Sequence, residues 1–194
     1  MSGLVASIFI AATAVVALLF DFVLIIIGNK VLETEDKIKV LFVCMGNICR
    51  SPTAEGVFRK LLNEKQLHDR FHIDSAGTHA FHVNEAPDLR AQKAAAERDI
   101  DLSNIRARKV VHGDFEDFDH ILAMDSENYE ILMAACPEDH RHKIKYFLDF
   151  APHLGEREVP DPYYGGKFGF ERVINMVEEA SLGFLNALSL EDET

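Results

Sequence analysis

The stretch Val40-Leu-Phe-Val-Cys-Met-Gly-Asn-Ile-Cys-Arg-Ser51 joins an apolar run to a polar loop. Its first four residues, with Ile38 before them, are typical of a buried parallel strand, and Pro52 after it favours the start of a helix. A loop that leaves a strand and enters a helix can direct several backbone N–H groups and the positive end of the helix dipole at one point. The stretch therefore predicts a phosphate-sized anion site at a strand–helix junction.

Two side chains of this loop carry chemistry. Cys44 and Arg50 lie six residues apart; a guanidinium can hold two phosphate oxygens at once, and positive surroundings favour the reactive thiolate of a cysteine. An isolated pair at this spacing would by default be a buried cysteine and a surface arginine. However, Gly46 permits a positive φ, Asn47 tolerates left-handed geometry and Ser51 is a suitable helix cap. These neighbours favour a nucleophile and an anion cradle in one loop.

Apolar patterns along the rest of the chain predict alternating strands and helices. Further strands are expected over residues 71–75, 118–124 and 144–148, and helices over 54–62, 86–98, 126–133 (capped by Ser126) and 173–188. Such alternation indicates an α/β fold with a parallel sheet covered by helices on both faces. Ligands of these sheets bind at the carboxyl ends of the strands, where Cys44 lies.

Composition restricts the possible partners. With 32 acidic and 20 basic residues among 194, the net charge of −12 argues against a general nucleic-acid binder. A phosphate ester remains a possible substrate, because the local field inside a cleft outweighs net charge. The three cysteines, at positions 44, 49 and 136, suit a reducing compartment with a reactive thiol better than a disulfide scaffold.

The N-terminal segment predicts a membrane anchor. Leu4 to Ile27 contains one charged residue, Asp21, and as a helix would measure about 36 Å, more than the roughly 30 Å hydrocarbon core of a bilayer. We expect a single hydrophobic helix within residues 1–30, a linker over 31–37, and the remaining chain in the cytoplasm, because lysines follow the span. The alternatives are a cleaved signal peptide and a translation start near Val31 or Leu32, which would leave the protein cytoplasmic.

Several segments together resemble a known family. Cys44 to Glu55, reading Cys-Met-Gly-Asn-Ile-Cys-Arg-Ser-Pro-Thr-Ala-Glu, closely resembles the signature of the low molecular weight protein tyrosine phosphatases. Asp74-Ser-Ala-Gly-Thr78, Met124-Asp125 and Asp161-Pro-Tyr-Tyr-Gly165 resemble later signatures, in the family's order. The resemblance runs from about Lys37 to about Leu188. It implies a phosphatase domain over residues 38–190 with a flavodoxin-like, four-stranded, three-layer fold, followed by an acidic tail over 191–194.

The family's reaction implies a role for each matching residue. Phosphotyrosine would be hydrolysed through a phosphocysteine on Cys44, with Arg50 holding the phosphate, Asp161 acting as general acid and then base, and no metal or other cofactor. The remaining matches divide into the phosphate-binding loop (Met45, Gly46, Asn47, Ile48, Cys49 and Ser51), the groups that hold the loop and thiolate (Asn47, Ser51 and Ser75) and the substrate cleft (Phe81, Tyr163 and Tyr164). Ile105 stands where family members often have a histidine that braces Asn47.

Some of these residues have simpler interpretations. Asp161 before Pro162 is also a common turn initiator, and Tyr163 and Tyr164 can be surface aromatics of a glycine-rich loop. Cys49 is either a small apolar loop residue or a redox partner that protects Cys44 through a disulfide.

Other functions are open to the same fold. These are thiol-coupled arsenate reduction, for which only Cys136 remains as a further cysteine, and phosphoarginine hydrolysis, whose enzymes tend to have threonine where this chain has Ile48. A non-catalytic, membrane-tethered phosphotyrosine-binding module is the alternative of another class. The expected partner is a tyrosine-phosphorylated protein, and the resemblance together with the predicted anchor suggests a membrane-associated tyrosine autokinase.

Overall fold

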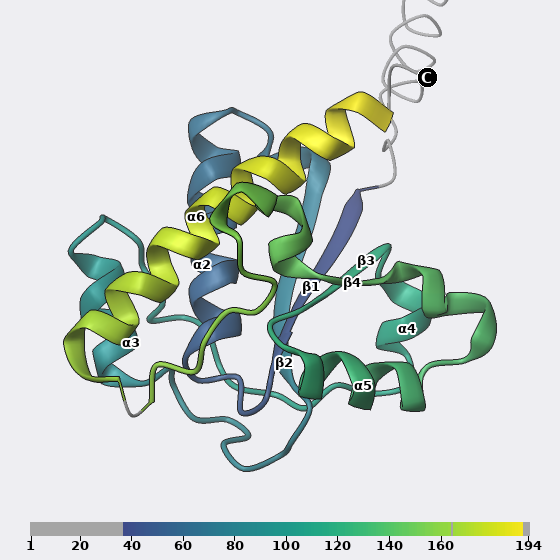
Figure 1. The fold of residues 1–194 in the computed structure, drawn as a ribbon, viewed down its shortest axis with the longest axis horizontal. Coiled ribbons are helices and arrows are strands. Elements are labelled where there is room, and N and C mark those ends of the chain that lie inside the picture. Colours follow the sequence, from purple (N-terminus) through teal and green to yellow (C-terminus); the bar gives the residue numbers. More distant parts are fainter. Residues whose placement is uncertain (1–36, 164, 192–194) are drawn as a thin grey trace, which may run out of the picture. The chain divides into compact units, whose positions relative to one another are not determined.

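A computed structural model of the chain describes residues 37–163 and 165–191. Within them, four parallel strands form one sheet in the order β2-β1-β3-β4 (Figure 1). The strands are β1 (Ile38–Cys44), β2 (Phe71–Gly77), β3 (His120–Ala123) and β4 (Ile144–Tyr146). The predicted four-stranded parallel sheet is confirmed.

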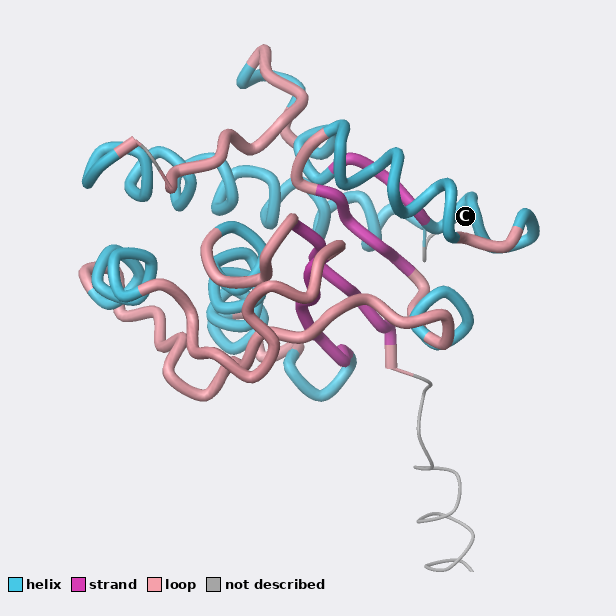
Figure 2. Tube along the Cα trace, turned by 90° about the horizontal axis from the view of Figure 1, so that it is seen from below, coloured by secondary structure: helices cyan, strands magenta, loops and turns pink. Residues whose placement is uncertain are grey.

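Helices cover both faces of the sheet (Figure 2). One face is covered by α2 (Arg50–Glu64), α3 (Leu89–Ala96) and α6 (Gly166–Glu191), and the other by α4 (Asp114–Asp117) and α5 (Ser126–Ala135). Short 3₁₀ turns occupy His68–Arg70, Glu138–Lys143, Phe147–Phe150 and Pro152–Leu154. The three-layer α/β architecture expected from the alternating pattern is therefore present.

The predicted membrane-spanning segment, Leu4 to Ile27, lies outside the residues that the structure describes. Within residues 37–163 and 165–191, every helix is too short or too polar to cross a bilayer.

The central strand is apolar because both of its faces are buried. Val40 and Phe42 pack into the core beneath α2 and α6, whereas Leu41 and Val43 pack on the side of α4 and α5. All four side chains are inaccessible to solvent. Side chains of a strand alternate between the two faces, so a strand in the middle layer needs an apolar residue at every position.

The strand order places a crevice at the carboxyl end of β1. Cys44 pairs with Gly77 of β2 on one side, and Val43 pairs with Ala123 of β3 on the other. The chain therefore leaves β1 toward one edge of the sheet and later returns to the opposite side of β1. This reversal is the topological switch point at which ligands of open α/β sheets bind.

Several predicted boundaries were wrong. The apolar run predicted as a strand over 144–148 ends as β4 at Tyr146, and Phe147 and Leu148 are buried in a 3₁₀ turn instead. Similarly, β3 covers only His120–Ala123, α3 begins at Leu89, and α6 begins at Gly166. An apolar run shows that a segment is buried, but it does not distinguish a strand end from a buried turn.

Candidate active site

Cys44 lies at the end of β1, and the loop after it leads directly into α2. The backbone N–H of Asn47 lies 3.3 Å from Cys44 Sγ, and Asn47 adopts the left-handed conformation with φ +55°. Helix α2 begins at Arg50, and its cap residue, Cys49, makes no side-chain hydrogen bond to the helix end. This helix terminus therefore has no side-chain acceptor from its cap residue, which is the arrangement that suits an anion.

The prediction that Ser51 caps the helix was wrong. Ser51 is already the second residue of α2, and its Oγ lies 3.0 Å from Cys44 Sγ. Ser51 Oγ also accepts a hydrogen bond from Asn47 Nδ2 at 2.9 Å, so its own hydrogen is available to the sulfur or to the carbonyl oxygen of Ala76. The hydroxyl is thus placed to contact the thiol of Cys44 rather than the helix end.

Asn47 is bonded through both atoms of its side-chain amide. Nδ2 donates to Ser51 Oγ and to Ser75 Oγ, each at 2.9 Å, and Oδ1 accepts from the backbone N–H of Arg108 at 2.9 Å. The structure therefore brings Asn47, Ser51 and Ser75 together as predicted. Family members often have a histidine that braces this asparagine, at the position of Ile105. In this chain the backbone N–H of Arg108, three residues later, donates to Asn47 instead.

A buried carboxylate completes this network. Ser75 Oγ donates to Glu55 Oε2 at 2.6 Å, and Arg59 pairs with the other oxygen of Glu55. Burial raises the pKa of the Glu55 carboxyl, although its hydrogen bonds from Ser75 and Arg59 partly offset this effect. Because Ser75 donates to Glu55, it accepts from Asn47, which gives the chain of hydrogen bonds one direction.

Arg50 lines the floor of the site and is held there by a carboxylate and a backbone carbonyl group. Nη1 contacts the carboxylate of Asp125 and donates to the carbonyl oxygen of Val159 at 3.1 Å, and the residue is only 3% exposed. Burial lowers the pKa of the guanidinium, but the charges of Cys44 and Asp125 raise it by more, so its pKa lies above the usual value. Arg50 therefore remains a fixed positive charge beside Cys44.

Asp161 faces Arg50 from a different loop. Its Oδ2 lies 3.9 Å from Arg50 Nη2, and its Oδ1 accepts from the backbone N–H of Tyr163 at 3.0 Å. The side chain is half-exposed. Asp161 thus makes the expected turn before Pro162 and also directs a carboxylate oxygen toward Arg50, at the start of α2. The turn is therefore confirmed, and the position of the carboxylate is compatible with the acid–base role that the resemblance implies.

A cavity of about 340 Å³ lies over the loop. Phe81 lines it and stacks on His79, with ring centroids 5.1 Å apart and planes 10° from parallel. Tyr163 lines the cavity as well, whereas Tyr164 lies outside the described residues. The lining residues that sequence analysis predicted are Cys44, Met45, Gly46, Ile48, Cys49, Arg50, Phe81, Asp161 and Tyr163. One open space therefore joins the thiol, the guanidinium, the carboxylate and two aromatic rings.

Comparison with known proteins identifies the family that the sequence resembles. The model of the low molecular weight phosphotyrosine protein phosphatase family matches residues 39–194. The chain belongs to this family. A low molecular weight protein-tyrosine-phosphatase of Synechocystis sp. is 44% identical over 154 residues, which cover 79% of this chain and 98% of that protein. The chain is accordingly a protein-tyrosine phosphatase.

Solved structures agree with the fold of this phosphatase. A protein tyrosine phosphatase from Entamoeba histolytica, with Hepes in the active site, is 42% identical with a TM-score of 0.78, covering 80% of this chain and 99% of that one. Vibrio vulnificus Wzb in complex with benzylphosphonate is 30% identical with a TM-score of 0.69, covering 78% of this chain and 99% of that one. The likeness thus extends over nearly the whole length of these smaller relatives.

The three cysteines of the phosphatase are all free and buried. Burial first, and then the negative charges of Asp88, Cys44 and Asp161, raise the pKa of Cys49 to about 12. Cys44 and Cys49 belong to the core on the α2 side of the sheet, whereas Cys136 belongs to the core on the α5 side. Cys136 is therefore separated by the sheet from the other two thiols.

Sequence analysis assigned no role to several residues of the site. Asp125 caps α5 through a 2.8 Å bond from Asn128 N, a role predicted for Ser126, and also holds Arg50. Its position directly after a buried strand next to β1 was the available signal. His82 lines the cavity close to Gly46, and Glu55 lies beneath the loop. No sequence pattern pointed to His82, whereas Glu55 is the last residue of the matching signature, where it was given no role.

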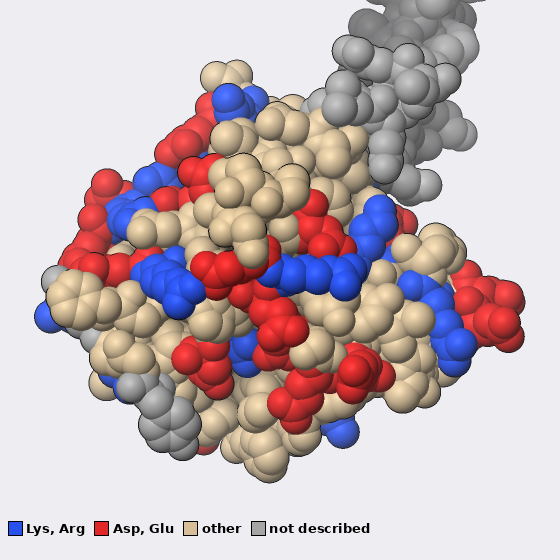
Figure 3. Space-filling view, in the orientation of Figure 1, with Lys and Arg blue, Asp and Glu red and all other residues tan. Residues whose placement is uncertain are grey.

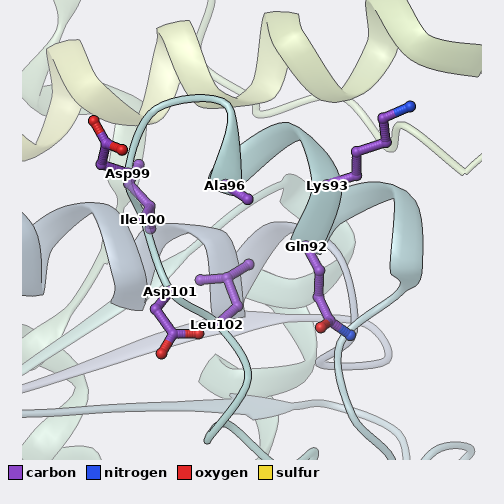
Figure 4. A pocket seen from close by; sticks show the side chains of 7 residues that line it. All are labelled: Gln92, Lys93, Ala96, Asp99, Ile100, Asp101 and Leu102. Carbon is purple, nitrogen blue, oxygen red and sulfur yellow. The ribbon is translucent and has the colours of Figure 1, made fainter.

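A second cavity, of about 610 Å³, lies beside α3 and the turn that follows it (Figure 4). Its charged side chains, Lys93, Asp99 and Asp101, point in different directions rather than toward a common point. The cavity includes none of the predicted site residues. It therefore offers no arrangement comparable to the one around Cys44.

Proposed function

We propose that this phosphatase hydrolyses phosphotyrosine through a phosphocysteine intermediate on Cys44. The observation that carries the proposal is the convergence of Cys44, Arg50 and Asp161 on one cavity, with a guanidinium–carboxylate separation of 3.9 Å. The Cys44 thiolate attacks phosphorus, so that an S–P bond forms while the bond to the phenolic oxygen breaks. Arg50 and the loop amides stabilise the equatorial oxygens, much as an oxyanion hole does.

Asp161 supplies and then removes the protons. As an acid it protonates the leaving phenolate; as the resulting carboxylate it takes a proton from water, whose oxygen attacks phosphorus and releases the S–P bond. Its half-exposed position gives it access to both the ester oxygen and solvent. No electron transfer is involved, and the products are tyrosine and inorganic phosphate.

The cavity favours an aromatic phosphoester over the alternatives. Ile48 contributes an apolar side chain where phosphoarginine phosphatases tend to have threonine, and Phe81 and Tyr163 provide two aromatic walls. The Vibrio vulnificus relative is in complex with benzylphosphonate, an aromatic ring joined to a phosphonate. Arsenate reduction is disfavoured because Cys136, the only cysteine outside the loop, lies across the sheet.

The test is hydrolysis of matched phosphotyrosine, phosphoserine and phosphoarginine peptides by the full chain and by Cys44→Ser, without added metal. We expect turnover of the phosphotyrosine peptide, abolished in the variant. Preference for phosphoarginine would contradict the substrate, and turnover that survives in Cys44→Ser would contradict the nucleophile. Binding of phosphotyrosine without turnover would instead indicate a non-catalytic module.

We further propose that the hydrophobic stretch from Leu4 to Ile27 anchors the phosphatase to the cytoplasmic face of a membrane. A membrane-associated tyrosine kinase would then meet the phosphatase in two dimensions, at a raised effective concentration. The apolar composition of this stretch supports the anchor. Deletion of residues 1–30 should release the protein into the soluble fraction and raise tyrosine phosphorylation of a membrane substrate; an unchanged location would refute the anchor.

A further inference from the structure

Asp88 and Arg90 form a rigid ion pair at the start of α3. Asp88 caps this helix by accepting from Arg90 N at 2.8 Å, and its two oxygens also accept from Arg90 Nε at 2.9 Å and Nη2 at 2.7 Å. A bidentate pair of this kind fixes the plane of the guanidinium as well as its position. The hydrogen bonds from Arg90 lower the pKa of Asp88, so the pair stays charged at neutral pH.

The free side of this guanidinium reaches the loop that carries Asp161. Arg90 Nη1 donates to the carbonyl oxygen of Tyr163 at 2.8 Å. The guanidinium carbon also lies 4.9 Å from the ring centroid of Tyr163 and 5.0 Å from that of Phe170, which is buried near the start of α6. Arg90 therefore contacts Tyr163 through both its backbone and its ring.

The same residue, Tyr163, orients the carboxylate of Asp161. Its backbone N–H donates to Asp161 Oδ1 at 3.0 Å, which leaves Oδ2 facing Arg50. On the other side of the cavity, the backbone N–H of Asp88 donates to the carbonyl oxygen of Ile48 in the phosphate loop at 2.8 Å. The Asp88–Arg90 pair thus connects both walls of the site without touching the reacting atoms.

We propose that Arg90 is a positioning residue that holds the Asp161 loop at a fixed distance from the phosphate loop. This inference rests on the general-acid role proposed above for Asp161. A proton donor acts only at hydrogen-bond distance from the leaving oxygen. Loss of Arg90 therefore impairs proton donation while leaving the thiolate and the phosphate-binding groups in place.

If Arg90 positions Asp161, the loss of kcat/KM in an Arg90 variant should depend on how basic the leaving group is. A phosphotyrosine peptide releases a basic phenolate that needs a proton, whereas 4-methylumbelliferyl phosphate releases a much less basic one. We expect Arg90→Ala to lower kcat/KM about tenfold for the peptide and less than about threefold for the umbelliferyl ester. If Arg90 only stabilised the fold, both substrates would lose activity equally.

Arg98 provides a matched control. It also joins the segment of α3 to α6, through Glu178 and Asn175, but contacts neither loop of the site. Arg98→Ala should leave kcat/KM unchanged for both substrates. Thermal unfolding of the full-length variants checks that each is folded, and Arg90→Gln, which keeps part of the side-chain packing, replaces Arg90→Ala if the latter does not fold.

A double variant separates this inference from the proposed function. In an Asp161→Asn background, adding Arg90→Ala should change kcat/KM less than about twofold, because the group that Arg90 positions no longer donates a proton. The same tenfold loss in that background would overturn the positioning role. If Asp161→Asn alone left turnover of the peptide unchanged, the general-acid assignment itself would fail.

Discussion

Asn47 connects three separate segments of the chain, those of Ser51, Ser75 and Arg108, through one side-chain amide. It accepts from Arg108, donates to Ser51 and Ser75, and through Ser75 reaches the carboxylate of Glu55. Each partner is buried or part-buried, so an unpaired group here would cost about 1–3 kcal/mol. The loop around Cys44 is therefore held by a network in which every member is bonded, and which joins the thiol of Cys44 at one end to the carboxylate of Glu55 at the other.

Substituting Glu55 should change how stability depends on pH. Burial raises the pKa of this carboxyl in the folded chain above its ordinary value of 4.5. The protonated form therefore contributes stability that is fully present below about pH 4.5 and is lost as the pH rises through the folded pKa. Glu55→Gln cannot ionise, so the free energy of unfolding of the wild type should fall relative to that of the variant as the pH rises above about 4.5.

Urea unfolding of both full-length proteins across this range measures the difference. One pH unit between the folded and unfolded pKa values corresponds to about 1.4 kcal/mol. Glu64→Gln, an exposed position at the end of the same helix, is the control and should show a smaller change. A difference that stays constant with pH would mean that Glu55 does not titrate in this range.

The proposed redox role of Cys49 predicts a slow disulfide at neutral pH. A pKa of about 12 keeps this thiol protonated, and attack on an oxidised Cys44 requires the thiolate. After mild peroxide treatment we expect the fraction of a 44–49 crosslink, measured by mass spectrometry, to rise steeply from pH 7 to pH 9 relative to sulfinic Cys44. Cys49→Ser should yield only over-oxidised Cys44, whereas a crosslink that is complete at pH 7 would contradict the raised pKa.

At the scale of single residues, the sequence showed which residues belong to the site better than it showed which groups they bond. Cys44 and Arg50 were singled out by their chemistry and by the turn and cap preferences of their neighbours, whereas Asp161 was singled out only by the resemblance to the family's signature. The brace of Asn47 was not predictable, since a backbone N–H is present at every residue except proline and only the path of the chain at Arg108 selects it. Asp125 was similarly overlooked as the partner of Arg50, because their contact joins two different strand ends.

At the scale of elements, α6 packs unusually closely against the 3₁₀ turn Phe147–Phe150. A Cβ atom added at Gly183 would lie 1.9 Å from the carbonyl oxygen of Phe150. Gly183→Ala should therefore lower the free energy of unfolding by about 2 kcal/mol, because the clash outweighs the gain in helix propensity of about 1 kcal/mol. Urea unfolding tests this, with the exposed Asn186→Ala expected to stay within about 0.5 kcal/mol of the wild type; a stabilised Gly183→Ala would refute the close contact.

The elements show why boundaries were harder to predict than the fold. Apolar patterns identified the four strands and the four longer helices, because burial imposes them over many residues, whereas the four-residue α4 is too short to show such a pattern. The start of α2 was misplaced because serine is a residue type that often caps helices. The hydroxyl of Ser51 contacts Cys44 instead, so this tertiary contact overrides the local preference for a cap position. The end of β4 was misplaced for the converse reason, since Phe147 is as buried in a turn as it would be in a strand.

At the scale of the whole molecule, charge is arranged in two opposing ways. The chain has a net charge of −12, and Figure 3 shows acidic side chains across one face, with basic ones in short separate groups among them. The cavity, in contrast, contains the buried guanidinium of Arg50 beside a helix N-terminus. A phosphorylated substrate therefore approaches through a repulsive outer field and binds in an attractive local one.

This arrangement predicts that kcat/KM changes with salt in opposite directions for substrates of opposite charge. Raising ionic strength from about 20 to about 200 mM shortens the screening length to less than 10 Å, which weakens the outer field more than contacts inside the cavity. For phosphotyrosine peptides flanked by acidic residues, kcat/KM should therefore rise severalfold; for peptides flanked by lysines it should fall. A small aryl phosphate is the control, because it lacks flanking charges and should respond less than either peptide. If all three substrates responded alike, salt would be acting on phosphate binding at Arg50 rather than on the approach of the substrate.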